Sequence, residues 1–146
     1  MKKILIPVDS SEFSERAIEE GKKMAKAFDS KVVLLHVVEL RIATMRFSAT
    51  VPQAIPVDPY EENEKKDASD MLEAYKDSFG GMKNKVEIQV LYGIVSDEII
   101  KIINDTDVDF VIMGSDGIVS TLYRTLLGSV TNKVVHHSKK PILVIK

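Results

Sequence analysis

Residues 109–117 read Asp109-Phe110-Val111-Ile112-Met113-Gly114-Ser115-Asp116-Gly117, and after ten intervening residues the chain continues Gly128-Ser129-Val130. The apolar run 110–112 predicts a buried strand, and the glycines follow directly after it. Glycine lets a backbone N–H approach a ligand with no Cβ in the way. Gly128-Ser129 falls where a helix is expected to begin, and helix N-termini bind anions. The pattern therefore predicts an anion site, most naturally for a phosphate.

The spacing of these glycines matches neither of the two familiar phosphate loops, G-x-x-x-x-G-K-[ST] and G-x-G-x-x-G. Further context comes from apolar runs, rich in Ile and Val, that alternate with helical patterns along the chain. Strands are predicted at 3–8, 31–38, 85–91, 109–113 and 141–145. This alternation favours a mostly parallel α/β sheet with helices on both faces. Ligands of open sheets bind where the strand order reverses. The pattern leaves that order open; in a 3-2-1-4-5 order, Asp9 and Gly114 would share one crevice.

The four predicted helices are delimited by capping residues. Ser10 or Ser11 caps the first helix, and Ser96 is predicted to cap the third. Asp58-Pro59 is typical of the start of the second helix, which Gly80-Gly81 ends. The last helix is predicted over 129–138.

The composition is that of an ordinary globular protein of 146 residues, expected to form a single domain over 1–146. A net charge of −2 gives no electrostatic reason to expect nucleic acid or an anionic membrane as a partner. The chain has no cysteine, which fits a cytoplasmic protein. No run approaches the roughly 18 apolar residues of a membrane span. The apolar start ends at Asp9 and is too short for a signal peptide. We therefore expect a cytoplasmic protein.

Residues 39–57 are predicted to form a long irregular loop that contains Pro52 and Pro56. Loops longer than about 12–15 residues tend to be lids, binding loops or disordered segments. A mobile linker and a functional flap are equal alternatives here. Arginines pair with phosphates through two parallel hydrogen bonds, and the candidates are Arg41, Arg46 and Arg124.

Three blocks of the sequence resemble the universal stress protein family, in the same order. Residues 4–10, Ile-Leu-Ile-Pro-Val-Asp-Ser, are similar to its first strand and acidic end, and 34–38 to its second strand. The third block comprises 109–117, 126–130 and 140–144, and is similar to the family's fourth strand through its C-terminus. The resemblance implies a nucleotide-binding α/β domain with a Rossmann-like, adenine nucleotide alpha hydrolase-like fold. Its open parallel sheet of five strands would have the order 3-2-1-4-5.

The resemblance also implies which residues meet the ligand, which would be ATP or another adenine nucleotide. The backbone of Val37 would meet adenine with Pro7 and Val8 nearby, and Asp9 would lie near the ribose. The phosphates would be surrounded by the loop and helix start formed by Met113, Gly114, Ser115, Asp116, Gly117, Gly128, Ser129 and Val130. A homodimer joined through the last strand is implied as well, and an apolar edge strand at 141–145 is open to such pairing.

Two departures from the family's ATP-binding motif, G-x2-G-x9-G-[ST], are present. Ten residues separate Gly117 from Gly128, and Asp116 stands where binding members commonly carry histidine or another residue without negative charge. A carboxylate about 5 Å from a phosphate charge costs roughly 3 kcal/mol at an effective dielectric of 20. This exceeds the about 0.3–1 kcal/mol that a helix N-terminus contributes. A bridging Mg²⁺ or Mn²⁺ would reverse the sign; otherwise Asp116 turns away or affinity is weak.

Several polar residues have a structural interpretation beside a functional one. Asp9 either contacts the ribose or caps a helix, and Ser129 can bind phosphate and cap the last helix at once. His36 is interpreted as a partnered core histidine. The adjacent His136 and His137 point in different directions on a helix, which argues against a shared metal. The acidic series Asp105, Asp107 and Asp109 lacks the rest of a calcium loop and is interpreted as a polar turn.

Three functions remain open at the level of the sequence. The first is an ATP-binding module in stress response or signalling. The second is a slow ATP hydrolase, against which stands the lack of a P-loop lysine and of an evident general base. The third is a dimeric interaction protein of the same fold that does not bind ATP.

Overall fold

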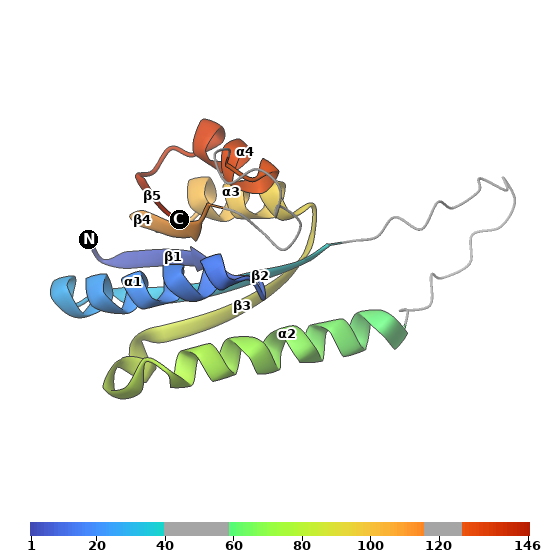
Figure 1. Ribbon diagram of the computed structural model, residues 1–146, viewed down its shortest axis with the longest axis horizontal. Helices are drawn as coiled ribbons and strands as arrows, with labels where there is room; N and C mark the ends of the chain where they lie inside the picture. Colours follow the sequence, from blue (N-terminus) through green and yellow to red (C-terminus); the bar gives the residue numbers. More distant parts are fainter. Residues whose placement is uncertain (40–58, 116–126) are drawn as a thin grey trace, which may run out of the picture.

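The computed structural model describes residues 1–39, 59–115 and 127–146, and alternates strands and helices along the chain (Figure 1). The predicted loop 39–57 therefore lies almost entirely outside the described residues. The elements in chain order are β1 (Lys3–Pro7), α1 (Glu12–Phe28), β2 (Lys31–Glu39), α2 (Pro59–Asp77), the 3-10 helix η1 (Gly80–Lys85), β3 (Val86–Gly93), α3 (Val95–Asp105), β4 (Phe110–Gly114), α4 (Ser129–His137) and β5 (Ile142–Ile145).

The five strands form one parallel sheet in the order β3-β2-β1-β4-β5, which confirms the order implied by the family resemblance. The central strand β1 is short and pairs with β2 from Lys3↔Lys31 to Pro7↔Leu35. β2 continues to Glu39, where it pairs with Gly93 at the end of β3. Because β1 ends at the level of Leu35 while β2 continues to Glu39, the sheet has a notch, that is, a gap at the carboxyl end of β1.

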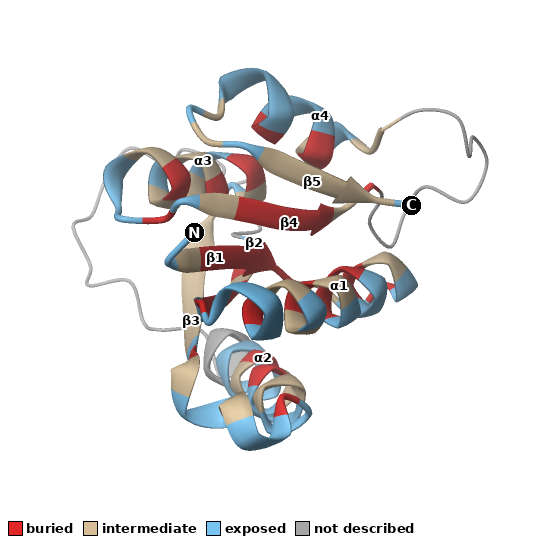
Figure 2. Ribbon diagram, turned by 90° about the vertical axis from the view of Figure 1, so that its left-hand side faces the viewer, coloured by how far each residue is buried: buried red, intermediate tan, exposed pale blue. Residues whose placement is uncertain are grey.

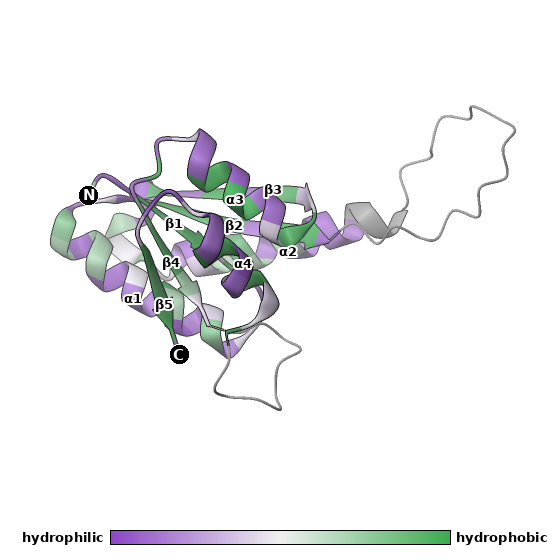
Figure 3. Ribbon diagram, turned by 90° about the horizontal axis from the view of Figure 1, so that it is seen from above, coloured by the Kyte–Doolittle hydropathy of each residue, from purple (hydrophilic) through white to green (hydrophobic). Residues whose placement is uncertain are grey.

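Helices cover both faces of the sheet, with α1 and α2 on one side and α3 and α4 on the other (Figures 1 and 2). Successive residues of a strand point to opposite faces, so Ile4 and Ile6 pack toward α1 and α2 while Leu5 packs toward α3 and α4. β1 and β4 are buried along most of their length, whereas β5 is half-buried throughout. Figure 3 shows apolar strands between helices whose outer faces are hydrophilic.

The helix ends agree with the predictions for α1 and for the end of α2. Ser11 is the N-cap of α1, where its side chain accepts a hydrogen bond from the Ser14 N–H. α2 begins at Pro59, as predicted, although its expected cap Asp58 lies outside the described residues. The chain leaves α2 before Gly80, whose φ of 56° belongs to the left-handed region that glycine tolerates.

The predicted cap of the third helix is wrong. α3 begins at Val95 with Ile94 at the N-cap, and the carbonyl of Ile94 accepts hydrogen bonds from the backbone of Asp97 and Glu98. Ser96 is instead buried inside the first turn. The helix starts early because Gly93, with a φ of 152°, turns the chain directly from β3 into α3. For α4, Gly128 occupies the N-cap, so Ser129 is the first helical residue rather than the cap.

Candidate functional site

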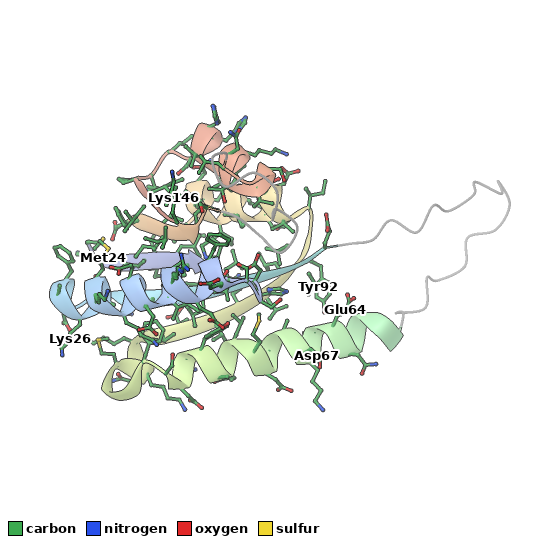
Figure 4. All side chains as sticks on the ribbon, viewed as in Figure 1. Met24, Lys26, Glu64, Asp67, Tyr92 and Lys146 are labelled. Atoms are coloured by element: carbon green, nitrogen blue, oxygen red, sulfur yellow. The ribbon has the colours of Figure 1, made fainter. Side chains whose placement is uncertain are left out.

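A cleft of about 600 Å³ opens at the carboxyl ends of β1, β2 and β4, between the first turns of α3 and α4. In Figure 4 this is the end of the sheet at which Tyr92 of β3 lies, opposite Met24 and Lys26. The predicted site residues that line the cleft are Pro7, Val8, Asp9, Val37, Met113, Gly114, Gly128, Ser129 and Val130. Their position follows from the notch in the sheet, and their roles toward a ligand stay predictions.

Among the described residues, β2 has no strand partner on its β1 side beyond the level at which β1 ends. The Val8 N–H donates to the Leu35 carbonyl at 2.7 Å, which shows that Leu35 directs its backbone groups toward β1. Because these groups alternate along a strand, Val37 also directs its N–H and its carbonyl to that side. β1 has already ended at this level. The cleft wall therefore presents one backbone donor and one backbone acceptor at Val37.

Gly114 lies on the opposite side of the notch. The Ser115 N–H donates to the Ile145 carbonyl at 2.7 Å, so Ser115 directs its backbone toward β5 and Gly114 directs its own toward the end of β1. The Gly114 carbonyl accepts a hydrogen bond of 2.9 Å from the Thr131 hydroxyl of α4. Ser115 is buried and does not line the cleft; its carbonyl accepts a hydrogen bond from the Gly128 N–H at 2.8 Å.

The first turn of α4 forms one wall of the cleft. The first N–H groups of any helix have no partner within the helix. Gly128 at the N-cap provides no side chain to satisfy them, and within 1–39, 59–115 and 127–146 no side-chain hydrogen bond caps this end. α1 differs, because Ser11 caps it. The N-terminus of α4 is therefore a place where a negatively charged group would be stabilised.

Asp9 is held at the floor of the cleft by the start of α1. Its Oδ1 accepts hydrogen bonds from the Ser11 N–H at 2.9 Å, from the Ser11 hydroxyl, and from the Ser14 hydroxyl at 2.6 Å. Asp9 is therefore not itself the cap of α1, which is Ser11; its carboxylate holds the residues at the start of that helix in place. Within the described residues no hydrogen bond reaches Oδ2, which leaves that oxygen for the predicted contact with a ribose.

His36 is partnered, as the sequence predicts. Its Nδ1 lies 2.7 Å from the Val8 carbonyl, and because a carbonyl only accepts, we assign the ring proton to Nδ1. The ring is half-buried and forms part of the cleft wall. Its contact with Val8 joins β2 to the segment in which β1 ends.

Lys133 was missed by the sequence analysis, which considered only arginines as partners of a phosphate. It lies one helical turn after Ser129 in α4, lines the cleft, and forms an ion pair of 2.6 Å with Asp97 of α3. The hydrogen bond from Lys133 lowers the pKa of the Asp97 carboxyl below its usual value. The i, i+4 spacing from Ser129 is the signal that could have identified Lys133.

Other predicted candidates lie away from the cleft or outside the described residues. The Nδ1 atoms of His136 and His137 lie 2.8 Å from the carbonyls four residues earlier. Asp107 pairs with Lys3, and Asp109 accepts backbone hydrogen bonds, which agrees with a polar turn.

No cluster of potential metal ligands occurs in 1–39, 59–115 and 127–146. The candidates outside these ranges are Asp116, Gly117, Arg41, Arg46 and Arg124. None of the described helices is long and apolar enough to cross a membrane.

Comparison with known proteins gives consistent matches over the full chain. The sequence model of the Universal stress protein family matches residues 1–146. Universal stress protein MJ0577 of Methanocaldococcus jannaschii is 37% identical over 154 residues, which cover 99% of this chain and 94% of that protein. The structure of universal stress protein UspA from Lactobacillus plantarum matches with a TM-score of 0.79 at 22% identity, covering 99% of this chain and 97% of the other.

Two further solved structures with this fold are nucleotide complexes. One is a universal stress protein in complex with cAMP, with 19% identity and a TM-score of 0.66, covering 99% of this chain and 95% of the other. The second is the universal stress protein from Archaeoglobus fulgidus in complex with dAMP, with 18% identity and a TM-score of 0.68. It covers 100% of this chain and 98% of the other. At identities below 25%, these two matches show a shared fold and no more.

Proposed function

Because the chain belongs to the universal stress protein family, we propose that it binds an adenine nucleotide in the cleft at the carboxyl ends of β1, β2 and β4. The observation that carries the proposal is the pairing of two unlike walls. On one side lies the backbone edge of Val37, and on the other lies the N-terminus of α4; in the described part of the chain no strand pairs with the first and no side chain caps the second. Family members of the same fold in complex with cAMP and dAMP support the same class of ligand.

The Val37 wall suits the base. Adenine carries an amino donor beside ring-nitrogen acceptors, and these are complementary to the carbonyl and the N–H of Val37. Apolar side chains would cover the faces of the ring, and those that line the cleft are Val8, Ile94, Val95, Ile99 and Met113. Guanine presents an oxygen acceptor where adenine has the amino group. The site should therefore favour adenine over guanine.

The α4 wall suits the phosphates, and Oδ2 of Asp9 suits a ribose hydroxyl. We propose ATP as the fullest ligand of this site, and we propose Asp116 and Gly117, which lie outside the described residues, as further contacts. The carboxylate of Asp116 calls for a divalent cation, Mg²⁺ or Mn²⁺, between it and the phosphates. A role in stress response or signalling is proposed from family membership.

A homodimer formed through β5 is the second part of the proposal. β5 is an edge strand of four apolar residues, and all four are half-buried in the single chain. An apolar edge strand is a template for pairing with another strand. Two copies joined edge to edge across a two-fold axis would cover it. This observation also favours the alternative of a dimeric interaction protein that does not bind ATP.

The experiment that tests nucleotide binding is calorimetric titration of the purified chain with ATP, AMP, adenosine and GTP, each with and without Mg²⁺. Acid extraction beforehand shows whether nucleotide is already bound. We expect the adenine ligands to bind and GTP to bind more weakly. Absence of binding by every adenine ligand, with and without the metal, would overturn the proposal and favour the interaction protein. Phosphate release in the ATP samples would identify a slow hydrolase.

A further inference from the structure

One ion pair spans the mouth of the cleft. The ammonium of Lys133, in α4, lies 2.6 Å from Oδ1 of Asp97, in the first turn of α3. Both side chains are about half exposed, at 46% and 48%. Towards the C-terminal ends of the two helices, Asn104 donates to the His137 carbonyl at 3.2 Å and accepts from the Lys139 N–H at 3.0 Å. Among the described residues, the Lys133–Asp97 pair is therefore the polar link between α3 and α4 at the cleft.

The position of Lys133 on α4 directs its charge toward the proposed phosphate site. Long side chains on a helix lean toward its N-terminus and lie over the preceding turn. The turn that precedes Lys133 begins at Ser129, where no side chain of the described residues caps the first N–H groups of α4. The ammonium can therefore reach a group bound at that turn without a change of backbone.

The charges around the cleft give Lys133 a particular importance. Asp9 and Glu39 are the carboxylates that line it, and Lys133 is the single lysine or arginine among the described lining residues. A nucleotide phosphate brings further negative charge into this space. A cation placed beside the phosphate is the group that offsets it, and hydrogen bonds between charged groups are the strong ones.

We propose that Lys133 exchanges partners: it is held by Asp97 in the empty cleft and turns to the phosphate of the bound nucleotide. The inference rests on the proposed nucleotide site and adds a regulating pair to it. Asp97 acts as an internal competitor for Lys133, so it weakens binding of phosphorylated ligands and leaves adenosine unaffected. Occupation of the site releases the link between α3 and α4 at the cleft, while the Asn104 contacts at the other end remain.

The pair can be removed without loss of the fold, because exposed ion pairs contribute little to stability. The test measures the affinity of the wild type, Lys133→Gln, Asp97→Asn and the double variant for adenosine, AMP and ATP by calorimetry. Lys133→Gln should lower the affinity for ATP about ten-fold or more, since it removes a charged hydrogen bond. It should leave the affinity for adenosine unchanged. Asp97→Asn should tighten ATP binding, and this gain should vanish in the double variant.

Matched variants separate local contact from net charge. Lys101→Gln and Asp105→Asn make the same charge changes at exposed positions that do not line the cleft, and should leave all three affinities unchanged. An equal loss of adenosine and ATP binding in Lys133→Gln would overturn the exchange, as would a gain from Asp97→Asn that persists in the double variant. If the wild type binds adenosine and ATP, and Lys133→Gln binds ATP as tightly as the wild type does, the partner exchange is refuted while the nucleotide site stands. If the wild type binds neither adenosine nor ATP, the nucleotide site itself fails.

Discussion

Phe13 packs directly on Gly114: a Cβ built on Gly114 would lie 2.6 Å from the Cβ of Phe13 and 3.0 Å from its carbonyl carbon. The first turn of α1 thus rests on the end of β4. Gly114 has no side chain, and this allows the close contact between α1 and β4. The same feature would let a ligand approach the backbone of Gly114. The floor of the cleft depends on the same contact, because Asp9 and the start of α1 lie beside it.

Gly114→Ala should therefore destabilise the protein even without any ligand. The new methyl group meets backbone atoms that cannot turn away, and overpacking of this kind costs about 1–3 kcal/mol. Gly81→Ala is the matched control, because a Cβ there meets nothing within 4 Å. Urea unfolding measures both. Equal stability of the two variants would show that α1 can shift away from β4.

The sequence predicts the fold well because the strands differ so clearly from the helices. The apolar runs at 3–8 and 109–113 are short, rich in Ile and Val, and bounded by polar residues. In the structure they become the two strands that lie side by side at the centre of the sheet. The strand order could not be derived from these patterns, since an apolar run does not show which other strand it pairs with. It came from the family resemblance.

The candidate site could be predicted only in part. Glycines and the acidic end of the first strand are visible in the sequence, so Gly128 at the α4 wall and Asp9 were expected to line the site. Ile94 and the pairing of Lys133 with Asp97 were not, because nothing in the local pattern shows that the first turns of α3 and α4 face each other across a cleft. The start of α3 was misplaced for a similar reason: Ser96 is typical of a cap, but the turn at Gly93 begins the helix before it.

The two roles of Asp9 can be separated by substitution. Asp9→Ala removes the acceptor of three hydrogen bonds at the start of α1 and should lower the free energy of unfolding by about 1–3 kcal/mol. Asp9→Asn keeps an acceptor oxygen and should lose less stability. If Oδ2 contacts the ribose, Asp9→Asn should still weaken adenosine binding, measured by calorimetry on the folded variant. Unchanged adenosine affinity in Asp9→Asn would leave Asp9 with the structural role alone.

Asp109 should contribute to acid sensitivity. Its Oδ2 accepts hydrogen bonds from the backbone N–H groups of Lys2, at 2.7 Å, and Lys3, at 3.1 Å, and these lower the pKa of its carboxyl. Near the usual pKa of about 3.9, the native chain therefore binds fewer protons than the unfolded chain. The contribution to stability is fully present above that pH and is lost as the pH falls through the lowered pKa.

Asp109→Asn should accordingly flatten the decline in stability below about pH 4. Urea midpoints measured from pH 7 to pH 3 give the slope for each variant. Asp105→Asn serves as the control, because Asp105 is exposed and its side chain makes no hydrogen bond within the described residues. A slope for Asp109→Asn as steep as that of the control would contradict the assignment.

Asp116 gives a prediction from sequence alone, since it lies outside the described residues. If its carboxylate lies about 5 Å from a bound phosphate, the repulsion is roughly 3 kcal/mol at an effective dielectric of 20. Asp116→His should therefore tighten ATP binding in the absence of metal and reduce its dependence on Mg²⁺. Calorimetric titrations with EDTA and with Mg²⁺ measure both. Unchanged affinity under the two conditions would mean that Asp116 turns away from the phosphates.

The edge strand β5 gives the last prediction. If two copies pair through β5, a charged side chain in the strand should prevent it, since lysine on an edge strand blocks pairing with another chain. Val144→Lys should convert a dimer into a monomer, measured by sedimentation velocity at micromolar concentration. Val135→Lys makes the same chemical change on α4, where the residue is already 39% exposed, and should leave the dimer intact.

Far-ultraviolet circular dichroism checks that both variants keep their helices and strands. A wild-type chain that sediments as a monomer would contradict the pairing directly. Dissociation by Val135→Lys as well would place the interface on the α4 face instead of the strand edge.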